Sequence, residues 1–420
     1  MRHLAYLLII FLLPFRVVLG QSEITLEECY RLARENYPNL GQLDILSEIT
    51  ALKHENIKTN YLPKINLKGQ ASYQSDVPGI SMNIPNLEIP EVPKAQYKAY
   101  LEFQQNIWDG GLTASKQVLE TAALHSRLNQ LEVELFQLKD KVNKAWFSAM
   151  LAQKSIKVYE ARLAVIREKQ KKLESGVRNG VIEESGLDVL LAEEQLTGQS
   201  ITEIEAGYKA SLNVLSILTG KAISPSSKLV FNEQGIDLTQ GLNRPELALF
   251  ESQANQLDAG SELIQKQRNP KLFGFGQAGF GQPGLNLLND KFDSFYLVGV
   301  GMSWNVFDWK QAKREKQIMG LQRDAVQAQI KTFKQSISIL LEQQQANIEK
   351  LNKLLQSDAK IVSLREKISG KSASKLENGT ITPADYISVL NSELIAKLRL
   401  ETHKIQLQEA KIIYNNIKGI

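Results

Sequence analysis

Residues able to do chemistry are few and scattered in this chain of 420 residues. The four histidines lie far apart and form no ligand pair, and the single cysteine, Cys29, excludes an intrachain disulfide and a cysteine-based metal cluster. Gly274, Gly276 and Gly279 match the GxGxxG pattern, but a dinucleotide site needs that pattern between a strand and a helix. Here the glycines lie inside a strand-like segment, so we do not expect them to bind a dinucleotide.

A second phosphate-binding pattern is also incomplete. Gly370-Lys371-Ser372 resembles the end of a Walker motif, but Arg365 occupies the position of the required first glycine and the region is helical in composition. Paired carboxylates, a nucleophile elbow and a histidine cluster are likewise not recognisable. We therefore expect neither an enzyme nor a bound metal or cofactor.

Residues 1–20 have the pattern of a secretory signal peptide. Arg2 precedes an apolar run from Leu4 to Leu13, and Val18 and Gly20 occupy the −3 and −1 positions of a cleavage site. The run is too short to span a bilayer, and no later stretch approaches 18 apolar residues. Cleavage would lower the formal net charge from +4 to +2, because the leader contains Arg2 and Arg16. We expect an exported chain with no transmembrane helix and no nucleic-acid partner.

The rest of the chain is a tandem duplication. Two pairs of segments recur 207 residues apart, and two further pairs recur 199 apart: YPNL (37–40) with RPEL (244–247), PKINLKGQASY (63–73) with PKLFGFGQAGF (270–280), NIWD (106–109) with NVFD (305–308), and RNGVIEESGLDVLL (178–191) with ENGTITPADYISVL (377–390). Ordered agreement of this kind indicates an internal repeat. We predict a first repeat over 21–220, a connector over 221–243 that forms part of a collar, and a second repeat over 244–420.

The residue pattern of each repeat predicts two strands followed by a long helix. Apolar and polar residues alternate over about 63–74, 96–108, 270–281 and 294–307, and aromatic residues gather at the ends of these segments. A length of about ten residues suits a tilted transmembrane β-strand.

The helices that follow the strands have a coiled-coil pattern. Asp109 and Asp308 are placed to cap them. In the first repeat, apolar or small residues recur in steps of three and four over several heptads: Leu128, Leu131, Leu135, Leu138, Val142, Ala145, Ala149, Ala152, Ile156, Tyr159, Leu163 and Ile166. Both helices end near an Asn-Gly pair, and shorter helices return to Gly220 and Gly419.

Four strands are too few to close a barrel, because about eight is the smallest closed number. Strands that span a lipid bilayer cannot leave unpaired edges, so several chains would have to pool them. The alternative is an exported structural coiled-coil protein or adhesin without a pore, in which the strand pairs form small soluble sheets.

The order of these segments resembles the TolC-type outer-membrane factors. The resemblance covers residues 21–420 and is carried by the opening ITLEECYRLARENYPNL (24–40), the strand start LPKI (62–65), the WDGG and FDW junctions, and the duplication itself. It implies a mainly α fold with a β part: a homotrimer with a twelve-stranded β-barrel, four strands per chain, continued by an α-helical coiled-coil tunnel in the periplasm. It further implies a passive outer-membrane exit duct, in contact with outer-membrane lipid, that works with a periplasmic adaptor and an inner-membrane transporter of RND, ABC or MFS type.

The resemblance also suggests functional positions. The turns between the helices match the family's periplasmic tip, so it implies adaptor docking at Asn179, Gly180 and Val181 and at Asn378, Gly379 and Thr380. Family members often narrow the pore with carboxylates just beyond the second tip. This chain has Ser388 and Asn391 at those positions, which departs from a charged ring. Asp385 and Asp188 lie nearby, and we expect them to be either a different ring or solvated surface carboxylates.

Overall fold

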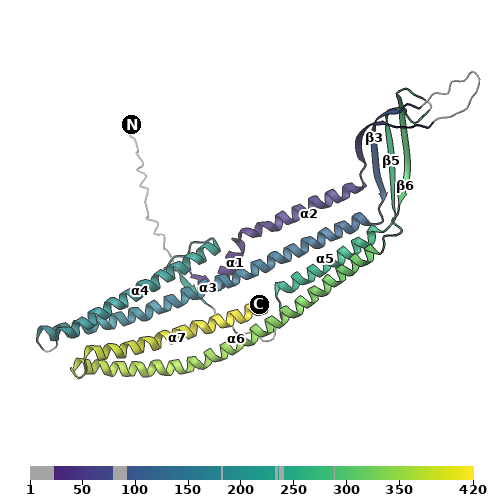
Figure 1. The fold of residues 1–420 in the computed structure, drawn as a ribbon. Helices are drawn as coiled ribbons and strands as arrows, with labels where there is room; N and C mark the ends of the chain where they lie inside the picture. The colour runs from purple at the N-terminus through teal and green to yellow at the C-terminus, as the bar shows by residue number, and fades with distance from the viewer. Residues whose placement is uncertain (1–22, 79–91, 181–182, 232–234, 236–240, 288) are drawn as a thin grey trace, which may run out of the picture. The chain divides into compact units, whose positions relative to one another are not determined.

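The duplication is directly visible in the computed structural model, which describes residues 23–78, 92–180, 183–231, 235, 241–287 and 289–420. The long helices α3 (Leu112–Arg178) and α6 (Gln311–Glu377) each contain 67 residues. The returning helices α4 (Glu184–Thr219) and α7 (Pro383–Lys418) each contain 36. Figure 1 shows α4 folded back along α3, and α7 along α6. The predicted signal peptide, residues 1–20, lies outside the described residues.

The remaining elements precede the long helix of each repeat or lie in the connector. In the first repeat they are β1 (Glu23–Thr25), α1 (Leu26–Glu35), a 3-10 turn η1 (Pro38–Gly41), α2 (Gln42–Lys58), a second turn η2 (Thr59–Tyr61), β2 (Lys64–Tyr73) and β3 (Ala95–Trp108). The connector contains β4 (Lys228–Val230), and the second repeat contains α5 (Pro245–Gln267), β5 (Lys271–Gln282) and β6 (Asp293–Ser303). The structure thus confirms the four predicted strands, except that β6 ends at Ser303 and not near residue 307.

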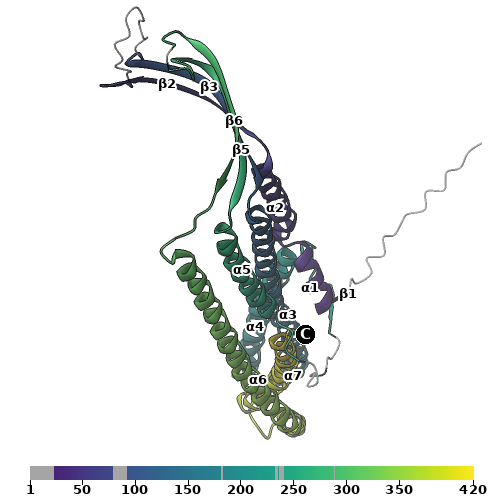
Figure 2. The same ribbon diagram turned by 90° about the vertical axis from the view of Figure 1, so that its right-hand side faces the viewer.

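The four long strands form one antiparallel sheet in the order β2-β3-β5-β6. Figure 2 shows the four strands side by side. Ile65 of β2 lies opposite Phe103 of β3, Leu101 of β3 opposite Ala278 of β5, and Gly276 of β5 opposite Val298 of β6. The central junction, between β3 and β5, therefore joins the two repeats.

A second, smaller sheet joins the start of the chain to the connector. The three residues of β1 pair in parallel with those of β4, with Ile24 opposite Leu229. Strands of three residues are too short for a periodic pattern, so the sequence did not predict them. The pairing holds residues 228–230 of the connector beside the start of the chain, and Leu229 is buried in the core.

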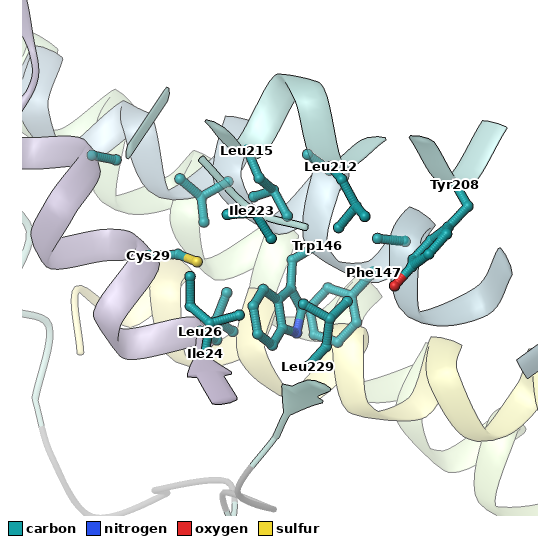
Figure 3. Close-up of a cluster of buried hydrophobic side chains, with 14 of the residues drawn as sticks. Ile24, Leu26, Cys29, Trp146, Phe147, Tyr208, Leu212, Leu215, Ile223 and Leu229 are labelled. Carbon is teal, nitrogen blue, oxygen red and sulfur yellow. The ribbon is translucent and has the colours of Figure 1, made fainter. Parts of the chain in front are cut away.

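The chain divides into two compact units, and the long helices α3 and α6 contribute to both. Residues 38–136 and 243–338 form the unit that contains the four-stranded sheet. The other unit contains residues 1–37, 137–242 and 339–420. Its main core surrounds Trp146, which is fully buried among side chains from α1, α3, α4 and the connector (Figure 3).

The predicted heptad seam of α3 is confirmed in this helical unit. Leu138, Val142, Ala145, Ala149 and Ile166 are all buried. The steps of three and four place these side chains on one stripe of the helix, where they meet the neighbouring helices. The seam thus holds the hairpins together.

Candidate functional site

One face of the four-stranded sheet is apolar and exposed. Leu67 of β2 is 79% exposed, Tyr296 of β6 is 77% exposed and Val300 is 73% exposed. The other large apolar side chains of this face are also exposed: Ile65, Tyr73, Tyr97, Leu101, Phe103, Phe280, Val298 and Met302. A continuous apolar surface of this kind on a soluble monomer would be unusual, so it marks a surface for contact with lipid or protein.

The opposite face of the sheet is polar near its β2 edge. The Lys68 ammonium lies 2.6 Å from a Glu102 carboxylate oxygen, and the Gln277 amide donates a hydrogen bond to the same carboxylate at 3.2 Å. These three residues come from β2, β3 and β5. The two faces therefore differ near the β2 edge, where one carries exposed apolar side chains and the other carries this polar group, as the two-residue period of a strand allows.

The glycines of β5 and β6 have a packing role. A Cβ atom on Gly276 would collide with the ring of Phe103, the residue opposite it on β3. Gly299 and Gly301 of β6 similarly lie against the rings of Phe275 and Phe273. Bulky rings on one strand thus fill the space left by glycines on the next, and Gly276 of the GxGxxG pattern is one of these glycines.

Both predicted aspartate caps are present at the strand-to-helix junctions. The backbone N–H groups of Gly111 and Thr113 donate to the Asp109 carboxylate at 3.0 and 2.7 Å. Those of Lys310 and Ala312 donate to Asp308 at 3.0 Å each. The two copies therefore build the same cap with the same spacing.

Asp109 is the more buried of the two aspartates, and the Tyr61 hydroxyl donates a third hydrogen bond to it at 2.7 Å. Burial alone would raise the pKa of Asp109. The hydrogen bonds from Thr113, Tyr61 and Gly111 outweigh that effect and hold its pKa below the usual value. The carboxylate is therefore ionised at neutral pH and stabilises the start of α3.

The tip turns have matching geometry in the two repeats. Gly180 has φ of 73° and Gly379 has φ of 67°, in the left-handed region that favours glycine. A Cβ atom on either glycine would meet nothing within 4 Å, so both turns are open to solvent. In the second turn Thr380 adds a hydroxyl bond to the Lys375 carbonyl at 2.9 Å. Asn179 and Asn378 precede these glycines, and Val181 lies outside the described residues.

Near the tips, an ion-pair cluster links the two long helices. Lys169 of α3 contacts Glu377 of α6 at 2.6 Å, and Lys172 contacts it at 2.8 Å. Hydrogen bonds from Lys169 and then Lys172 lower the pKa of Glu377 to about 2. The sequence analysis did not identify this cluster, because its members are about 200 residues apart and no motif joins them.

The candidate pore residues occupy different environments. Asp385 accepts hydrogen bonds from the Thr382 backbone N–H at 3.1 Å and the Thr382 hydroxyl at 2.7 Å, so it forms the capping box of α7. Asp188 and Ser388 are exposed on α4 and α7. The side chain of Asn391 accepts a hydrogen bond from Arg162 of α3.

Arg162 is the centre of a buried polar contact. Its side chain is only 8% exposed, and besides Asn391 it pairs with Glu193 of α4. The contact therefore links α3, α4 and α7 in one place. Among the described residues, no group of three or more His, Cys, Asp or Glu side chains is placed to hold a metal ion. Within the same part of the chain, no helix is long and apolar enough to cross a membrane.

Comparisons with known proteins give a match in structure but not in sequence. No protein-family model matches the chain, and no curated protein matches its sequence. The structure of CusC, described as a transmembrane channel, matches with a TM-score of 0.71 at 13% identity, over 93% of this chain and 91% of CusC. The outer-membrane channel CmeC of Campylobacter jejuni matches with a TM-score of 0.66 at 15% identity, over 94% of this chain and 86% of CmeC.

VceC, an outer-membrane protein of Vibrio cholerae, gives a TM-score of 0.66 at 14% identity, over 94% of this chain and 96% of VceC. The chain has the fold of these outer-membrane channels. The resemblance to TolC-type factors that the segment order indicated is thus confirmed for the fold, and the match extends over nearly the whole of each chain.

Proposed function

We propose that this chain is the outer-membrane exit duct of a bacterial tripartite efflux or type I secretion system. The observation that carries the proposal is the four-stranded sheet. One face is apolar and exposed, the other face carries a polar cluster near β2, and the outer edges of β2 and β6 pair with no other described strand. In a bilayer, unpaired edges cost several kcal/mol for each backbone group, so the sheet needs neighbours.

A homotrimer supplies those neighbours. Three copies contribute twelve strands, which is enough to close a barrel around a water-filled lumen. The apolar face then contacts lipid, and the face with Lys68, Glu102 and Gln277 lines the lumen. Exposed apolar side chains on the helices, including Leu196 and Ile217 of α4 and Ile361 and Leu364 of α6, support the same assembly because neighbouring copies would cover them.

The helices form the periplasmic part of the duct in this proposal. The open turns at Asn179-Gly180 and Asn378-Gly379 dock a periplasmic adaptor, which connects the duct to an inner-membrane transporter of RND, ABC or MFS type. A passive duct needs no chemistry of its own, in keeping with the channel descriptions of the matched structures. The exported substrate is set by the transporter.

Single-channel recording tests the proposal. The purified protein, added to a planar lipid bilayer, should give uniform conductance steps, and membrane fractions should contain a trimer that dissociates on gels only after heating. A soluble monomer without conductance would contradict the channel and favour the structural coiled-coil protein. The matched control is the same preparation after heating to the monomer, which should give no steps.

A further inference from the structure

Among the described strands, the sheet ends at β2 on one side and at β6 on the other, and neither outer edge is paired. We propose that β6 of one copy pairs antiparallel with β2 of a second copy in a single register, with Val300 opposite Ala71 and Met302 opposite Gly69. The inference rests on the proposed trimer and specifies how its copies join. The register follows from a junction that already exists inside one chain.

That junction is the pairing of β3 with β5. It joins the second strand of the first repeat to the first strand of the second repeat. The duplication relates β3 to β6 by an offset of 199 and β2 to β5 by an offset of 207. The observed pair Leu101–Ala278 then becomes Val300–Ala71, and Phe103–Gly276 becomes Met302–Gly69. Equivalent strands in equivalent positions should form equivalent ladders.

The transferred register also agrees with the side chains. It places Val300 and Met302 on the same apolar face as Ala71 and Gly69, and it places Gly301 opposite Gln70 on the other face. A slip of one residue would move every side chain of one strand to the wrong face. Met302 would lie over Gly69 as Phe103 lies over Gly276, a bulky residue beside a glycine in both junctions.

The early end of β6 supports the same pairing. Apolar alternation predicts a strand to residue 307, and β3 does continue to Trp108, the equivalent of Phe307. The last residues of β3 pair only with β5, because the ladder with β2 begins at the pair Lys64–Gln104. The equivalent residues of β6 need the β2 strand of a second copy.

Three side chains in this segment are more than half exposed. Trp304 is 54% exposed, Val306 is 64% exposed and Phe307 is 65% exposed. In the proposed junction they lie along residues 65–67 of the second copy. The proposal therefore accounts both for the unpaired edges and for the difference between the predicted and observed ends of β6.

Disulfide trapping tests the register. Two double variants are needed: Val300→Cys with Ala71→Cys, and separately Gly301→Cys with Gln70→Cys. The two pairs are adjacent in the proposed ladder, so one of them occupies a hydrogen-bonded position and the other a non-hydrogen-bonded position. Mild oxidation should convert over half of the chain to reducible covalent trimers with at least one of these pairs. The native thiol does not interfere, because burial raises the pKa of Cys29 to about 12.

The matched controls are cysteine pairs in which one partner is shifted by two residues along its strand, so that both thiols stay on the same face of the sheet. Met302→Cys with Ala71→Cys, and Gly299→Cys with Gln70→Cys, should give little crosslinking, since diagonal residues lie ~7–8 Å apart. Crosslinking of the shifted pairs instead, or a heat-sensitive trimer that no in-register pair traps, would overturn the register while leaving the trimer intact. A wild-type protein that remains monomeric in the membrane fraction would overturn both the register and the proposed function.

Discussion

Asp385 illustrates how one carboxylate can serve two purposes at the residue scale. Its hydrogen bonds with Thr382 stabilise the first turn of α7. The Thr382 hydroxyl, followed by its backbone N–H, lowers the pKa of Asp385, so the carboxylate is charged at neutral pH. A depressed pKa contributes stability at neutral pH, and that stability is lost as the pH falls through the folded-state pKa. The carboxylate is also exposed, and so remains available to an ion.

The observed capping role of Asp385 and its predicted role in the pore can be tested separately. If its charge lies at the pore, Asp385→Ala should reduce block of the reconstituted channel by divalent cations several-fold. Thr382→Ala weakens the same cap but keeps the carboxylate, so it should leave the block near the wild-type value. Bilayer recordings with increasing cation concentration provide the measurement. Equal block in the wild type and Asp385→Ala would remove this residue from the pore.

Asn391 shows where sequence reasoning fails at this scale. Alignment with the family's carboxylate positions predicted a pore residue, and that assignment stays a prediction. The structure adds a contact with Arg162, which is 229 residues away in the chain. A buried guanidinium needs partners, and no local pattern indicates which distant side chain supplies them. The same limit explains why the Lys169–Glu377 cluster was missed.

At the scale of elements, the sequence predicted most of the fold because its elements have strong periodic patterns. The long helices, the four strands and the aspartate caps all follow from spacing along the chain. The three-residue strands β1 and β4 do not, since their pairing depends on contact between segments about 200 residues apart. The 3-10 turn η1 at Pro38–Gly41, which separates α1 from α2, was not predicted either.

The core around Trp146 holds several of these elements together, so its loss should be costly. We expect Trp146→Ala to destabilise the helical unit by ~3–5 kcal/mol, because it removes the largest fully buried side chain. Trp146→Phe should cost much less, since it keeps most of the ring volume. Moreover, the indole N–H has no hydrogen-bond partner among the described residues.

Thermal unfolding followed by far-ultraviolet circular dichroism in detergent provides the measurement for Trp146. Trp309→Ala is the matched control, because that tryptophan is 78% exposed and its loss should shift the midpoint little. Equal midpoints for Trp146→Ala and the wild type would show that this cluster does not limit stability.

At the scale of the whole molecule, we expect substitutions at the tip turns to impair adaptor docking without changing the pore. Asn179→Trp together with Asn378→Trp adds bulk to two exposed turns and should abolish efflux without affecting the trimer or its conductance. Steric exclusion of the adaptor is the physical reason. Drug and metal-salt susceptibility of a strain that depends on this protein measures the loss.

Glu160→Trp is a suitable control for the tips, because Glu160 is exposed on α3 and lies 19 residues before Asn179. It should leave susceptibility at the wild-type level. Full efflux by the double tip variant would argue that the adaptor docks on another surface of the helices.

The sheet order β2-β3-β5-β6 has a consequence for the kinetics of assembly. If one repeat were a separate chain, six copies would have to assemble through five encounters before the ring could close. Covalent linkage makes the β3–β5 contact intramolecular, so its effective concentration is set by the chain and not by the amount of protein in the cell. In the proposed trimer each chain forms one of the six junctions as it folds, so three junctions form within chains and only three join different molecules. If the proposed trimer forms, the duplicated chain should close its ring at a lower expression level than a single-repeat chain would need.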